Sequence, residues 1–171
     1  MENPVPHRAR KRFGQHFLHD SGVVRRIVDH LQLNPEEILC EIGPGRGALS
    51  DRLVETGNSL HLIEIDRDLV PTLVDRYSAS PQVNVHEQDA LRLDLGTLNP
   101  DSQMVLVGNL PYNISTALLI HLLSQSKQVS RMVFMVQKEV GDRLSAQSGN
   151  KSYGRLTVMM SRVFEIVSLF D

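Results

Sequence analysis

Short apolar segments with strand character alternate with helical segments along most of this sequence, and this alternation is its most restrictive feature. Strands are expected at residues 38–42, 60–65, 83–86, 104–108, 131–136 and 164–170. Helices are expected between them, at about residues 21–31, 48–56, 68–77, 115–123, 138–144 and 153–162. Strands that alternate with helices pair in parallel, because each helix returns the chain to the same end of the sheet. The sequence therefore predicts an α/β fold, a doubly wound and mainly parallel sheet with helices on both faces.

Size and composition exclude several classes of protein. The 171 residues are enough for one α/β domain with a core. No apolar run reaches the roughly 18 residues that a membrane span needs, and the N-terminus lacks the apolar core of a signal peptide. One cysteine, Cys40, excludes an intramolecular disulfide, and the seven histidines form no metal-binding pattern. We expect a cytoplasmic, monomeric protein without a metal ion or a membrane partner, in which Cys40 is inert.

The N-terminal residues 1–18 are expected to form a basic arm ahead of a single domain at residues 19–171. The arm carries Arg8, Arg10, Lys11 and Arg12, whereas the whole chain has a net charge of −2. This balance argues against a protein that coats nucleic acid indiscriminately. The arm is either solvated or in contact with phosphates, which Lys and Arg usually bind. A mitochondrial presequence is a third interpretation, weakened by Glu2 and by the shortness of the arm.

A glycine-rich turn follows the first expected strand and reads Gly43-Pro44-Gly45-Arg46-Gly47. Such a turn between a strand and a helix brings backbone N–H groups close to a ligand, so Gly43 and Gly45 are candidate cofactor-binding residues. The spacing is G-x-G-x-G, whereas a dinucleotide fingerprint is G-x-G-x-x-G with glycine or alanine last. Ala48 therefore keeps a nicotinamide dehydrogenase as an alternative. Glu41 completes the pattern E-x-G-x-G-x-G, which is typical of class I methyltransferases and favours S-adenosylmethionine.

Two acidic residues follow the second and third expected strands. Glu64 lies 21 residues after Gly43, where a carboxylate can accept both ribose hydroxyl hydrogens of a nucleotide cofactor. Asp66 is a second candidate because strand alternation directs it to the same face, although both acids could instead cap the next helix. Asp89 could accept a hydrogen bond from the exocyclic amine of a cofactor adenine, for which a nicotinamide enzyme has no particular need.

The most specific pattern is Asn109-Leu110-Pro111-Tyr112, which follows the apolar fourth strand. The amine of adenine is a poor nucleophile because its lone pair is conjugated with the ring. Two acceptors, the Asn109 side chain and the carbonyl of residue 111, could each bind one hydrogen and direct the lone pair at a methyl donor. Proline would fix the backbone, and Tyr112 would stack on the extruded base. The alternative is an ordinary turn before a helix.

With these motifs, the chain resembles the ribosomal RNA adenine dimethyltransferases that modify two adjacent adenines near the 3′ end of small-subunit rRNA. The resemblance covers nearly the whole chain and includes Arg10-Lys11-Arg12-Phe13-Gly14-Gln15-His16-Phe17-Leu18, Phe134-Met135-Val136-Gln137-Lys138-Glu139-Val140 and Ser152-Tyr153-Gly154-Arg155-Leu156, besides the two motifs above. It implies that S-adenosylmethionine is the cofactor and that His16, Leu18, Gly43, Glu64, Asp89 and Asn109 line its pocket. Members carry Asn or His at position 16. The partner implied is small-subunit rRNA in the pre-30S particle, with residues 137–139 beside the target base.

This chain is expected to differ from the family in one respect, and two alternative functions remain open. Family members continue into a small helical domain that is absent here, so we expect cofactor binding but weak activity on the ribosomal particle. A large-subunit rRNA adenine dimethyltransferase is the alternative within the same class; the basic arm and Leu110 favour the small-subunit branch. The alternative from another class is a ribosome-assembly or RNA-binding factor of the same fold in which catalysis is secondary.

Overall fold

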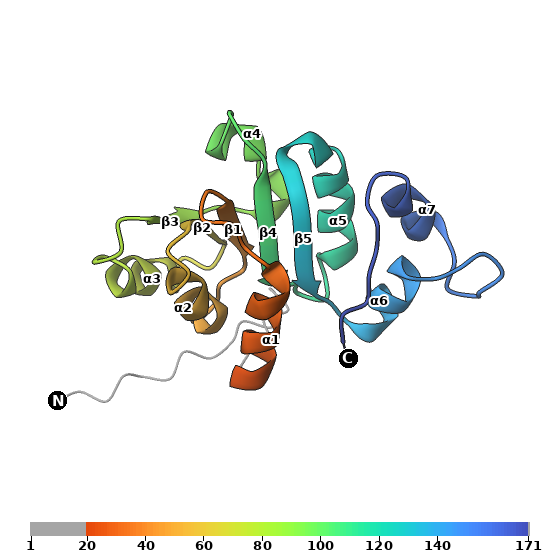
Figure 1. Cartoon of the computed structure of the whole chain (residues 1–171), viewed down its shortest axis with the longest axis horizontal. Coiled ribbons are helices and arrows are strands. Elements are labelled where there is room, and N and C mark those ends of the chain that lie inside the picture. Colours follow the sequence, from red (N-terminus) through yellow and green to blue (C-terminus); the bar gives the residue numbers. More distant parts are fainter. Residues whose placement is uncertain (1–19, 171) are drawn as a thin grey trace.

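A five-stranded parallel sheet forms the centre of the protein (Figure 1). The computed structural model describes residues 20–170, so the basic arm and the expected cofactor residues His16 and Leu18 lie outside the described part. The strands are β1 (Ile38–Ile42), β2 (Ser59–Glu64), β3 (Val83–Glu87), β4 (Met104–Asn109) and β5 (Val129–Met135), in the order β3-β2-β1-β4-β5. Every neighbouring pair is parallel. The predicted doubly wound α/β fold is confirmed.

Helices cover both faces of the sheet. One face packs against α1 (Ser21–Leu31), α2 (Ala48–Val54) and α3 (Val70–Arg76). The other packs against the short helices η2 (Ala90–Arg92) and α4 (Leu95–Leu98) and against α5 (Ser115–Leu123). The one-turn helix η3 (Ser126–Gln128) precedes β5, and α6 (Lys138–Leu144) and α7 (Arg155–Ser161) extend the second layer beyond α5. No helix in residues 20–170 is long and apolar enough to cross a bilayer.

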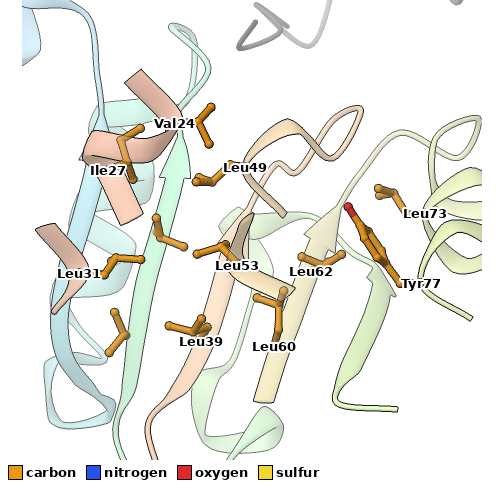
Figure 2. Close-up of a cluster of buried hydrophobic side chains, with 12 residues drawn as sticks. Val24, Ile27, Leu31, Leu39, Leu49, Leu53, Leu60, Leu62, Leu73 and Tyr77 are labelled. Atoms are coloured by element: carbon orange, nitrogen blue, oxygen red, sulfur yellow. The ribbon is translucent and has the colours of Figure 1, made fainter. Parts of the chain in front are cut away.

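Alternation along the central strands divides their side chains between the two layers. Leu39 on β1 belongs to the cluster under α1, α2 and α3, which Figure 2 shows, whereas its neighbour Cys40 belongs to the opposite cluster. Val105 and Leu106 on β4 divide in the same way. Because both faces are covered, β1 and β4 are apolar at nearly every position, as central parallel strands usually are.

Polar contacts fix the ends of α1. The Asp20 carboxylate accepts hydrogen bonds from the backbone N–H groups of Gly22 and Val23 and so caps the start of the helix. At the other end, Arg131 on β5 donates to the Leu31 carbonyl at 2.9 Å and makes a bidentate pair with Glu37 at 2.6 and 2.7 Å. This ion pair joins β5 to the segment between α1 and β1.

The prediction of a strand at residues 164–170 is wrong. The segment is irregular, and no strand of the described chain pairs with it. Its apolar alternation is nevertheless present, because Phe164, Ile166 and Phe170 pack against the hydrophobic clusters while Val167 is exposed. A period of two reports which side chains face the core, but a strand also needs a hydrogen-bonded neighbour.

Candidate active site

An open cleft lies at the carboxyl edge of the sheet, where β1, β2, β3 and β4 end. It contains about 1100 Å³ of space, including its open mouth. Its lining includes six of the residues expected from the sequence: Gly43, Gly45, Glu64, Asp89, Asn109 and Pro111. The cleft lies where the order of the strands reverses between β1 and β4, which is the usual ligand site of an open α/β sheet.

The glycine turn forms the floor of this cleft next to β1. Gly43, Gly45 and Gly47 have φ angles of 70°, 59° and 83°, a region that residues with a side chain rarely adopt. The Gly43 N–H donates to the Ile63 carbonyl at 2.9 Å, which ties the turn to β2. A Cβ at position 43 would meet no atom within 4 Å, so the glycine leaves open space on the cleft side.

Glu64 stands at the end of β2 and is only 3% exposed. Its carboxylate accepts hydrogen bonds from the backbone N–H groups of Gly45 at 3.0 Å and Asp66 at 2.8 Å, and Ile65 is a third backbone donor. Burial raises the pKa of Glu64, and the backbone hydrogen bonds oppose this rise. An ionised carboxylate can accept about four hydrogen bonds, so the group can still accept one from a ligand.

Asp66 does not line the cleft, and its expected role as a second candidate is wrong. The residue is completely buried, its carboxylate accepts the Asp68 N–H at 3.1 Å, and its carbonyl accepts the N–H groups of Leu69 and Val70. These contacts close the turn that leads into α3. The capping alternative is therefore correct for Asp66, while Glu64 faces the cleft.

Asp89 follows β3 and lies on the cleft wall next to Gln88 and Ala90. One of its carboxylate oxygens accepts the Leu91 N–H at 2.9 Å and so caps η2. This bond fixes the orientation of the side chain at the wall. Capping η2 therefore does not prevent Asp89 from accepting a hydrogen bond from a ligand in the cleft.

Asn109 ends β4 and lines the cleft, but the hydrogen bonds of the next residues change one expected role. The Pro111 carbonyl accepts from the N–H groups of Ile114 and Ser115, both at 3.2 Å, and from the Ser115 hydroxyl at 2.7 Å. Three donors from the start of α5 leave it no lone pair for a target amine. The Leu110 carbonyl accepts a hydrogen bond from the Gln137 side-chain amide at 3.3 Å.

Tyr112 is not part of the cleft lining and is 59% exposed, so its ring is accessible beside the mouth. Its hydroxyl lies next to the Glu139 carboxylate, whose hydrogen bond and charge raise the pKa of the phenol. Glu139 belongs to the segment 137–139 that the resemblance places beside the target base. The two segments therefore meet near the cleft.

Glu41 is a cleft residue that the sequence analysis used only as part of a pattern. It is 2% exposed, and one carboxylate oxygen accepts the Ser50 hydroxyl at 2.6 Å. Burial raises its pKa to about 8; the charges of Glu64 and Asp51 add to this rise, and the Ser50 bond opposes it. An acidic residue inside an apolar strand is the signal that could have identified it.

Two of the histidines and the cysteine have structural surroundings. His30 and His121 lie 2.7 Å from the backbone carbonyls of Arg26 and Leu93, respectively. Cys40 is buried, and burial raises the pKa of its thiol. Within residues 20–170, no three His, Cys, Asp or Glu side chains gather in a way that could hold a metal ion.

The parallel sheet, the glycine turn after β1 and the acidic residue at the end of β2 define the class I methyltransferase fold. A dimethyladenosine transferase from Plasmodium falciparum superposes with a TM-score of 0.72 and 28% identity over 85% of this chain and 52% of that one. A 23S rRNA methyltransferase, ErmE, gives 0.70 and 28% over 85% and 57% of the two chains. Coclaurine N-methyltransferase, solved with S-adenosylhomocysteine, shares only the fold, at 10% identity and a TM-score of 0.53.

Residues 6–170 match the family described as ribosomal RNA adenine dimethylase, and the chain belongs to this family. Relatives named ribosomal RNA small subunit methyltransferase A include one from Marinobacter nauticus, 47% identical over all of this chain and 62% of its own length. Another, from Hahella chejuensis, is 50% identical over 98% of this chain and 62% of its own length. The chain thus spans a little under two thirds of the relatives that it matches.

Proposed function

We propose that this chain transfers methyl groups from S-adenosylmethionine to the N6 amines of two adjacent adenines near the 3′ end of small-subunit rRNA, in the pre-30S particle of the cytoplasm. The observation that carries the proposal is the convergence of Gly43, Glu64, Asp89 and Asn109 on one cleft. Identity of 44–50% to relatives named ribosomal RNA small subunit methyltransferase A supports the small-subunit substrate over the large-subunit alternative.

The cleft offers the hydrogen-bonding groups that the proposed donor needs, gathered at one edge of the sheet. Glu64 would accept the ribose hydroxyls, Asp89 the adenine amine, and the turn at Gly43 and Gly45 would admit the ligand close to the backbone. His16 and Leu18 would complete this pocket. When bound, S-adenosylmethionine supplies an electrophilic methyl group on its sulfonium.

The residues after β4 would hold the target adenine. We assign the two acceptors for its amine to the Asn109 side-chain oxygen and the Leu110 carbonyl, since the Pro111 carbonyl is engaged by α5. Binding both amine hydrogens in fixed positions would aim the nitrogen lone pair at the methyl group, an effect of alignment and preorganisation. Pro111 would keep the turn rigid, and Tyr112 would stack on the base for about 1–3 kcal/mol.

Asn109→Ala tests this function. Calorimetry should show that the variant still binds S-adenosylhomocysteine, with a Kd that rises far less than the rate falls because Asn109 is only one of the residues that line the pocket, while methylation of 30S particles that lack the modification should fall about 100- to 1000-fold. Mass spectrometry of the rRNA measures the product. Asn84→Ala, at an exposed position on β3, is the matched control and should leave both values unchanged.

The comparison should include a full-length relative, because we expect residues 1–171 to bind the cofactor but to methylate the particle weakly. Full-rate methylation by this chain would contradict the second part. Unchanged methylation by Asn109→Ala would refute the assigned role of Asn109. RNA binding without any methyl transfer would favour the assembly-factor alternative. Tight binding of NADH in place of S-adenosylhomocysteine would favour the dehydrogenase.

A further inference from the structure

The C-terminal end of α3 contacts the glycine turn on the side that faces away from the cleft. The turn has little stiffness of its own, because three of its residues are glycines with positive φ, and the N-cap residue of α2, Gly47, has no side chain to cap the helix. Its shape must therefore depend on contacts from other elements. Two adjacent residues, Arg76 at the end of α3 and Tyr77 just after it, supply such contacts on the side away from the cleft.

Tyr77 is 7% exposed and packs beside Leu73 in the core (Figure 2). Its hydroxyl lies 2.8 Å from an Asp51 carboxylate oxygen and 3.3 Å from the Gly47 carbonyl. Burial and the Asp51 carboxylate raise the pKa of the phenol, so it stays a donor. A Cβ at position 47 would lie 2.5 Å from this hydroxyl, so the backbone and the phenol are in direct contact.

Arg76 makes the second contact. Its guanidinium donates to the Arg46 carbonyl at 3.1 Å and pairs with the other oxygen of the Asp51 carboxylate. Asp51 is in the first turn of α2, and its own N–H donates to the Gly47 carbonyl at 2.9 Å. One carboxylate thus joins both α3-side residues to the start of α2, and both carbonyls of the turn at 46 and 47 are bound.

We propose that Tyr77 and Arg76 are positioning residues of the cleft, which fix the glycine turn from outside and thereby set the affinity for the methyl donor. The inference rests on the proposed function, because it concerns the same cleft. Neither side chain lines the cleft, so any effect on ligand affinity must pass through the turn.

Tyr77→Phe keeps the buried ring and removes only the hydroxyl. The Kd for S-adenosylhomocysteine should rise about three- to tenfold, the range expected for losing a hydrogen bond that holds the site. Arg76→Lys keeps the charge opposite Asp51 but loses the forked geometry that reaches the Arg46 carbonyl, so it should also weaken binding. The effects of Tyr77→Phe and Asp51→Ala should be less than additive, because each removes the hydrogen bond between the Tyr77 hydroxyl and the Asp51 carboxylate.

A control variant and a second measurement distinguish a positioning role of Tyr77 and Arg76 from a general contribution to stability. Glu37→Gln breaks the ion pair to Arg131, far from the cleft, and should lower Tm without changing Kd. Amide hydrogen exchange of Gly45 and Gly47 should accelerate in Tyr77→Phe but not in Glu37→Gln.

Unchanged exchange at these two amides, or a Kd that does not differ from the control, would overturn the inference. Failure of the unchanged chain to bind S-adenosylhomocysteine would count against the proposed function instead, while the exchange measurement would still decide whether α3 fixes the turn.

Discussion

Replacing Glu41 by glutamine should stabilise the protein at alkaline pH and change little near pH 5. The Glu41 carboxyl is buried, and its pKa rises from 4.5 to about 8 in the folded state. Between these values the folded protein keeps a proton that the unfolded chain has released. The unfolded state then binds fewer protons, so the free energy of unfolding falls as pH rises through this window and levels off above about pH 8.

The size of this effect follows from the pKa difference. One pKa unit corresponds to about 1.4 kcal/mol, so ionisation of Glu41 costs up to about 5 kcal/mol at alkaline pH. Glutamine has nearly the same shape, cannot ionise, and still offers an oxygen to the Ser50 hydroxyl. Near pH 5 the native carboxyl is itself neutral, so the two proteins should have similar stability there.

Urea unfolding of both proteins between about pH 5 and pH 9 measures the difference. Glu37→Gln is the control of opposite sign: its hydrogen bonds to Arg131 lower the pKa of the Glu37 carboxyl. That carboxylate stabilises the fold above its unfolded pKa and loses its contribution as pH falls through the lowered value, so Glu37→Gln should destabilise by on the order of 1 kcal/mol at neutral pH and less in acid. A difference between native protein and Glu41→Gln that is the same at every pH would refute the reasoning.

Three further outcomes are expected. Gly108→Ala should cost about 3 kcal/mol or more in urea unfolding, because the new Cβ would lie 2.5 Å from the Ile42 carbonyl oxygen on the adjacent central strand; a cost below about 1 kcal/mol would contradict this. Gln137→Ala should lower the methylation rate about tenfold without changing the Kd for S-adenosylhomocysteine, because it removes the donor that holds the Leu110 carbonyl in place. An equal loss of methylation rate and of cofactor affinity would instead argue for a general structural role of Gln137. Cys40 should resist a thiol reagent in the native protein and react after unfolding, and rapid native labelling would show that its strand opens.

The order of elements could be predicted from the sequence because each central strand carries its own signal. The structure has α5 at Ser115–Leu123 and α6 at Lys138–Leu144, the same bounds that apolar spacing predicted. The helix expected to start at residue 68 begins at Val70, because Asp66 first closes a turn. The segment 164–170 could not be settled locally, since pairing depends on a neighbour that its own residues do not specify.

The cleft could be predicted where a residue's role follows from its place at a strand end, as for Glu64, Asp89 and Asn109. It could not be predicted where the role depends on the direction of a single group. The Pro111 carbonyl is directed into the first turn of α5, and no pattern in the sequence reports this. The raised pKa of Glu41 depends on how completely α2 covers β1, which is a property of packing.

The strand order also has a consequence for how the protein is made. β1 pairs with β2, the next strand along the chain, on one side and with β4 on the other, so one edge of β1 has no partner until residue 109 has been synthesised. A nascent chain that has emerged only as far as Asp89 already contains Glu64 and Asp89, the two acidic residues proposed to bind the methyl donor. One edge of β1 is still exposed at that stage. About 20 more residues must be synthesised before β4 covers that edge and Asn109, at the end of β4, is in place to hold the target base. Until β4 arrives, the exposed edge of β1 is the part of the nascent chain that a chaperone would have to protect from aggregation.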